Sequence, residues 1–119
     1  MYFVDRTATV LKPTEKFLAW LKSCDSDMPD LTLAQIRTNC SVYLVPQFDE
    51  PEAVITYFDD RYQEIFAAEL SGWDIEKSKW PQDMSLQAFW EFFEVEIHDM
   101  VLDMEAAELN VSPVFDNMM

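Results

Sequence analysis

The negative charge of this chain is confined to one part of the sequence. Residues 1–48 contain five acidic and five basic residues, whereas residues 49–119 contain 18 acidic residues and three basic ones, so the second stretch carries the whole formal net charge of −15. From Trp80 onward there are nine acidic residues and no Lys or Arg. A fold for this chain must keep these carboxylates in water while its apolar residues form a core.

Length and composition limit the class of protein. The chain has 119 residues, of which 50% are hydrophobic and 14% aromatic, which predicts one folded domain with one core. The sequence pI of about 4.1 argues against direct binding to nucleic acid or to an anionic membrane, because both require surplus cations. We find no run of 18 apolar residues, and Asp5 and Arg6 interrupt the N-terminal stretch, so we expect a cytoplasmic protein.

The sequence contains few motifs that are known to bind small-molecule cofactors. The only glycine is Gly72, which excludes the glycine-rich phosphate-binding motifs. Cys24 and Cys40 cannot form a zinc knuckle by themselves, and we expect reduced thiols, with a disulfide between them as the open alternative. We therefore predict no cofactor.

Apolar spacing and the six single prolines predict an α+β fold, a single small domain with a short, mostly antiparallel sheet and helices packed on it. We expect strands around positions 2–11, 41–45 and 94–98, the last with a continued helix as the alternative. We expect helices after Thr14 to about Cys24, over 32–38, from Asp49 or Glu50 to about Leu70, and after Ser85. The domain spans residues 1–119, with 106–119 as a C-terminal tail docked on the body or on a neighbouring copy.

The long helix starting at Pro51 is predicted to be amphipathic. At about 100° per residue, one face gathers apolar residues and the opposite face gathers acids. Glu69 falls on the apolar side, so we expect the helix to fray or bend there before Gly72. The apolar face contains Val54, Phe58, Tyr62, Ile65 and Phe66, and the acidic face contains Glu52, Asp59, Asp60 and Glu64.

Catalytic chemistry has little support in the sequence. His98 is the only histidine, and no serine-bearing elbow accompanies it. A metal site is the stronger candidate, because Glu94, Glu96 and His98 would share one face of a strand, with Asp99 and Asp103 close by. Neither an EF-hand nor an HExxH motif is present, and an acidic run is more often a solvated face. We therefore predict no metal site and no enzymatic activity.

The segregated acid has three interpretations. It can serve solubility alone, it can form a docking surface for a basic partner protein, or it can imitate the phosphates of DNA. Duplex DNA carries one charge per ~1.7 Å of axis. A long acidic helix face beside an acid-bearing strand would supply two roughly parallel rows of charge.

In size, charge and layout, the chain resembles the small acidic bacterial DNA-mimic proteins, which include a Neisserial protein that binds the histone-like protein HU. The segments FVDR at 3–6, VYLVP at 42–46, WPQD at 80–83 and EVEIHDMVLD at 94–103 are also similar to a family of short proteobacterial proteins. The first resemblance implies no catalysis, no cofactor and a basic DNA-binding partner. It aligns no motif from which individual residues could be carried over.

We therefore predict a non-enzymatic DNA mimic whose acidic face binds HU or a similar nucleoid or regulatory protein and blocks its DNA binding. The alternative is an acidic interaction module whose partner does not bind DNA. The predicted partner-binding residues are exposed acids of the long helix and of the region after Ser85, namely Glu52, Asp59, Asp60, Glu64, Glu91, Glu94, Glu96, Asp99 and Asp103.

Overall fold

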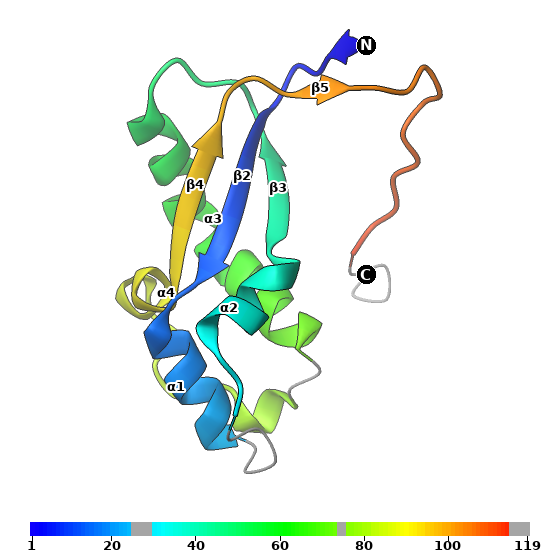
Figure 1. Ribbon diagram of the computed structural model, residues 1–119. Helices are drawn as coiled ribbons and strands as arrows, with labels where there is room; N and C mark the ends of the chain where they lie inside the picture. Colours follow the sequence, from blue (N-terminus) through cyan, green and yellow to red (C-terminus); the bar gives the residue numbers. More distant parts are fainter. Residues whose placement is uncertain (25–29, 74–75, 115–119) are drawn as a thin grey trace.

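A three-stranded antiparallel sheet is the centre of the molecule (Figure 1). The computed structural model describes residues 1–24, 30–73 and 76–114. In the sheet, β2 (Thr7–Pro13) lies between β3 (Ser41–Val45) and β4 (Phe93–His98). The described helices are α1 (Glu15–Cys24), α2 (Leu33–Ile36), α3 (Pro51–Gly72) and α4 (Leu86–Phe92), with the 3-10 turns η1 (Arg37–Asn39) and η2 (Lys77–Lys79). The predicted α+β class is confirmed.

Alternation along β2 gives the sheet one covered and one open face. Thr7, Thr9 and Leu11 are buried, whereas Val10 and Lys12 on the other side are partly exposed. Such a period of two is expected for a strand with one face against the core. The buried Thr9 hydroxyl is satisfied, because its Oγ1 donates a hydrogen bond of 2.7 Å to the carbonyl of Tyr43.

Helix α3 packs on the covered face of the sheet (Figure 1). It begins as predicted, with Pro51 in the first turn after the extended Glu50. Its apolar face is also as predicted, because Val54, Phe58, Ile65 and Phe66 are buried and Tyr62 is half-buried. This face joins the sheet and α4 in one hydrophobic core.

The predicted fraying at Glu69 is wrong. The helix continues to Gly72, and the Ser41 Oγ donates a hydrogen bond of 2.9 Å to Oε2 of Glu69. A buried carboxylate is tolerated when a donor reaches it. The hydroxyl of β3 therefore allows α3 to keep an acid on its apolar side.

Helices α1 and α4 close the core through aromatic contacts. Phe17 of α1 meets Phe92 edge to face at 5.7 Å between ring centroids, and Phe66 of α3 meets Phe89 at 5.6 Å. Both predicted N-caps are present, because the Thr14 Oγ1 accepts from the amide of Phe17 and the Ser85 Oγ from that of Ala88. The chain leaves the helical conformation at Phe93, so the predicted strand around 94–98 is confirmed, with its start one residue earlier, and the continued helix is wrong.

The N-terminal strand is divided into two. β1 (Tyr2–Phe3) pairs with β5 (Leu102–Asp103) in a separate two-stranded arm, and β2 starts only at Thr7. The predicted continuous strand over 2–11 is wrong at residues 4–6. The arm is largely exposed, including 80% of Phe3.

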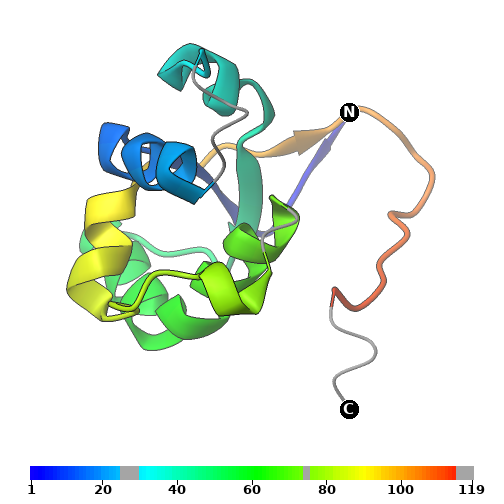
Figure 2. The ribbon, with the colours of Figure 1, turned by 90° about the horizontal axis from the view of Figure 1, so that it is seen from below.

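The tail leaves the body after the arm (Figure 2). Residues 106–114 are all exposed, so the predicted docking on the body is wrong for this part of the tail. Residues 115–119, which include Asp116, lie outside the described residues. Within the described ranges, no helix is both long and apolar enough to cross a membrane.

Candidate acidic interface

The acids of α3 point in different directions. Asp59 and Glu64 are about 140° apart around the helix. Asp59 is half-buried and accepts a hydrogen bond of 2.7 Å from Nε1 of Trp90 on α4. Glu52, Asp60 and Glu64 are exposed. The prediction that Asp59 is an exposed surface acid is therefore wrong, because its carboxylate faces α4.

The acids of β4 lie on the opposite side of the sheet from α3. Phe93, Val95 and Ile97 face the core that α3 covers, so the alternating residues Glu94 and Glu96 are exposed on the open face. The expected pair of parallel acidic rows, one on the helix and one on the strand, is therefore wrong. A single partner surface cannot cover both sets in the way that two strands of DNA would require.

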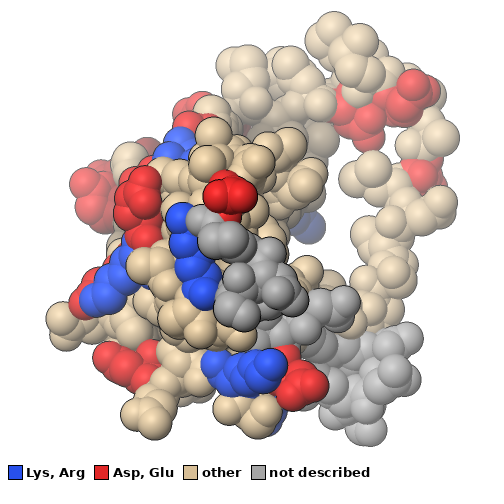
Figure 3. All heavy atoms as spheres, turned by 60° about the horizontal axis from the view of Figure 1, so that its bottom comes forward, with Lys and Arg blue, Asp and Glu red and all other residues tan. Residues whose placement is uncertain are grey.

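Basic side chains compensate most of the acids on the open face. The Lys12 Nζ lies 3.6 Å from Glu96 and 4.0 Å from Glu94, and the Arg37 Nη2 lies 3.0 Å from Glu94. Glu91, which is half-buried, pairs with Lys16. In the view of Figure 3, Lys and Arg side chains likewise lie among Asp and Glu side chains.

His98 lies on the same face of β4 as Glu94 and Glu96, as predicted. Its Nε2 lies 2.8 Å from Oε2 of Glu96, and this hydrogen bond, together with Lys12, lowers the pKa of Glu96. Glu94, Glu96 and His98 do share one face, yet the residues that the structure describes include no group of three acidic, His or Cys side chains that could hold a metal ion. The charged side chains on this face of the sheet form a network of exposed ion pairs.

Four acids gather at the end of the molecule where β4 stops and α3 begins. We call this group, Asp49, Glu50, Glu52 and Asp99, the acidic end. Asp49, Glu50 and Asp99 line a hollow of about 220 Å³, and Glu52 follows in the first turn of α3. All four are exposed, and none has an ion pair among the described residues.

The floor of this hollow is apolar. Phe48, Val54 and Ile97 line it together with the acids. Phe48 is held in place by the ring of Tyr57, with centroids 5.8 Å apart. The side chain of Glu50 makes no capping hydrogen bond to α3, so its carboxylate oxygens remain available to a binding partner.

The sequence predicts Asp49 and Glu50 at the start of the long helix, and the predicted partner-binding residues do not include them. The sequence signal was present, because three acids flank Pro51 within four residues. Their meeting with Asp99 depends on the tertiary packing of α3 against β4. Asp103 lies apart from this group on β5, where it is half-buried and accepts a hydrogen bond from the amide of Glu105.

Buried polar groups lie on the other side of α3. Burial raises the pKa of Glu69, and the hydrogen bond from Ser41 partly offsets this effect. Burial also raises the pKa of Tyr43 above its usual range, with a second contribution from the Glu69 carboxylate. Cys40 and Cys24 are not joined in a disulfide. Glu69 and Tyr43 lie between β3 and α3, and they do not contribute to the acidic end.

The chain matches no protein-family model, and neither the curated proteins nor the solved structures provide a match.

Proposed function

We propose that this protein is a non-enzymatic interaction protein whose acidic end binds the Lys- and Arg-rich surface of another protein. The observation that carries the proposal is the group of four unpaired carboxylates, Asp49, Glu50, Glu52 and Asp99, beside a hollow with an apolar floor. Most acids of the open sheet face form ion pairs with basic residues of the same chain, whereas these four form none with the residues that the structure describes.

The hollow suits a long cationic side chain. Lys and Arg place their methylene stems on apolar surfaces and keep the charged group near polar atoms. Phe48 and Ile97 would contact the stem, and Asp49, Glu50 or Asp99 would accept hydrogen bonds from the ammonium or guanidinium group. Each ion pair at such an exposed site contributes little, so several must act together.

A DNA-binding protein is the first candidate partner. The formal net charge of −15 would steer the chain toward any strongly basic surface, as DNA does. Asp60 is also exposed on α3 and adds negative charge to the helix beyond Glu52. In this form of the proposal, the protein occupies the DNA-binding surface of HU or a similar nucleoid or regulatory protein.

An acidic interaction module with a partner that does not bind DNA is the second candidate. The observation in its favour is that the acids of α3 and of β4 lie on opposite sides of the molecule. A compact group of four carboxylates matches a local basic patch, whereas mimicry of a duplex benefits from a longer double row.

A competition experiment separates the two candidates. Labelled duplex DNA is bound to HU, and the protein is added in a gel-shift titration at moderate salt. Release of DNA by the wild-type chain, and weaker release by the variant Asp49→Asn/Glu50→Gln/Glu52→Gln/Asp99→Asn, would support the DNA-mimic form. No release of DNA from HU or from other basic DNA-binding proteins would contradict it and leave the second candidate.

A further inference from the structure

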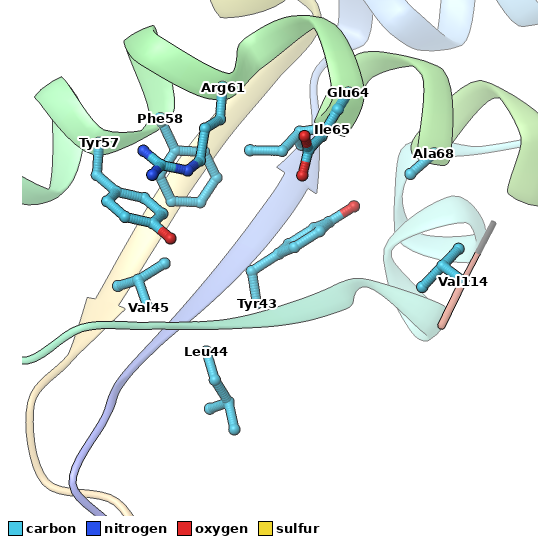
Figure 4. A pocket seen from close by; sticks show the side chains of 10 residues that line it. All are labelled: Tyr43, Leu44, Val45, Tyr57, Phe58, Arg61, Glu64, Ile65, Ala68 and Val114. Carbon is cyan, nitrogen blue, oxygen red and sulfur yellow. The ribbon is translucent and has the colours of Figure 1, made fainter. Parts of the chain in front are cut away.

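A groove of about 370 Å³ runs between β3 and α3 on the side away from β4 (Figure 4). Tyr43, Leu44 and Val45 line it from β3, and a stripe of α3 lines it from the other side. β3 pairs only with β2 among the described strands, so its outer edge is open at this groove.

The two edges of the sheet differ in their protection against further pairing. Edge strands of soluble proteins usually carry charges that discourage association with another strand. β4 follows this rule with Glu94, Glu96 and His98. β3 has the sequence SVYLV, with no charged residue, and its Val42 and Leu44 are 59% and 49% exposed. The β3 edge is therefore suited to pair with another strand.

The stripe of α3 beside this edge is complementary to itself. It consists of Tyr57, Arg61, Glu64 and Ala68, at spacings of four, three and four residues. A two-fold axis midway between Arg61 and Glu64 would place each Arg61 against Glu64 of the second copy, and Tyr57 against the small Ala68. Each cation would meet an anion, and each large side chain a small one.

The middle of β3 lies at the same level along the groove as the middle of the α3 stripe. Tyr43 is its middle residue, and its ring packs against Phe58 with centroids 6.2 Å apart. In the view of Figure 4, its ring lies across the groove from the part of α3 that carries Arg61 and Glu64, and its hydroxyl points along the groove toward Ala68. One two-fold axis can therefore pass close to both Tyr43 and the midpoint between Arg61 and Glu64.

We infer that two copies of this chain associate through this surface, with β3 pairing antiparallel to β3 of the second copy about Tyr43. Val42 then lies opposite Leu44 of the second copy, so the two exposed apolar side chains cover each other. The two sheets become one sheet of six strands, which removes the unprotected edge. Val114 of the tail also lines the groove, but it is 80% exposed and covers little of it.

Sedimentation velocity of the full-length chain over a range of micromolar concentrations tests the inference. The salt concentration should be about 0.15 M, so that repulsion between the two acidic chains is screened. We expect a dimer for the wild type and a monomer for Leu44→Lys, which adds a charge to the exposed side of the edge. Circular dichroism verifies that each variant is folded.

Reversal of the charges that face each other across the two-fold axis provides a sharper test. Arg61→Glu and Glu64→Arg should each weaken dimerisation about tenfold or more, because like charges then face each other. The double variant Arg61→Glu/Glu64→Arg should recover it, whereas Glu76→Arg, the same charge change on an exposed residue away from the stripe, should have little effect. A monomeric wild type, or folded single variants that the double exchange does not rescue, would overturn the inference.

Discussion

Nε1 of Trp90 donates a hydrogen bond of 2.7 Å to Oδ1 of Asp59, and this bond joins α4 to α3. It explains why Asp59 differs from its neighbour Asp60, which is exposed. Two adjacent acids in the sequence therefore have different roles, one in the fold and one on the surface.

Asp59→Ala should lower the free energy of unfolding by roughly 1–2 kcal/mol, because the half-buried indole N–H of Trp90 loses its acceptor. Asp60→Ala should change it by less than about 0.5 kcal/mol. Urea denaturation followed by tryptophan fluorescence measures both. Equal effects of the two substitutions would show that the bond to Trp90 does not stabilise the fold.

Glu69 should make stability depend on pH in a direction opposite to that of a paired surface acid. Burial raises the pKa of its carboxyl group in the folded state, so its favourable contribution is present below the usual value of 4.5 and is lost as the pH rises through the folded-state pKa. Glu69→Gln stays neutral and can still accept from Ser41. We expect this variant to be more stable than the wild type at pH 7.

The difference between Glu69→Gln and the wild type should decrease as the pH falls toward 4. Urea denaturation at several pH values measures it, with Glu108→Gln in the exposed tail as the control that removes one carboxylate without removing a buried one. A difference in stability between Glu69→Gln and the wild type that does not change with pH would show that the buried Glu69 carboxyl group is not its cause.

Phe66 should contribute far more to stability than Phe3. Phe66 is fully buried and contacts the rings of Phe89, Phe92 and Phe93, whereas Phe3 on the arm is 80% exposed. Phe66→Ala should cost about 3–5 kcal/mol, because it leaves a cavity in the core. Phe3→Ala should cost less than about 0.5 kcal/mol. Comparable losses of unfolding free energy for the two variants, in thermal or urea unfolding, would show that Phe66 is not a central core residue.

The elements with strong local signals were predictable from the sequence. Thr14, Ser85 and Pro51 mark helix starts through capping and fixed backbone geometry, and the structure contains all three starts. The apolar face of α3 was also correct, because its spacing follows the helical period through Val54, Phe58 and Ile65.

The errors concern contacts between distant parts of the chain. The helix α3 continues past Glu69, whose carboxylate accepts a hydrogen bond from Ser41, 28 residues away in the sequence. Asp59 turns inward because Trp90 lies on the adjacent helix. Similarly, the sequence predicts that the acids of α3 and β4 form one surface, whereas the packing of α3 on the covered face places Glu94 and Glu96 on the other side.

The most direct test of the proposed interface compares two variants of equal charge by isothermal titration calorimetry with HU at one salt concentration. One is Asp49→Asn/Glu50→Gln/Glu52→Gln/Asp99→Asn, and the other is Glu91→Gln/Glu94→Gln/Glu96→Gln/Asp103→Asn. Each reduces the magnitude of the net charge of −15 by four. The first should lose roughly 1–3 kcal/mol of binding free energy, the sum of several exposed ion pairs, and the second should lose clearly less. Equal losses in both variants would contradict the proposed interface, and no binding of HU by the wild type would contradict its assignment as the partner.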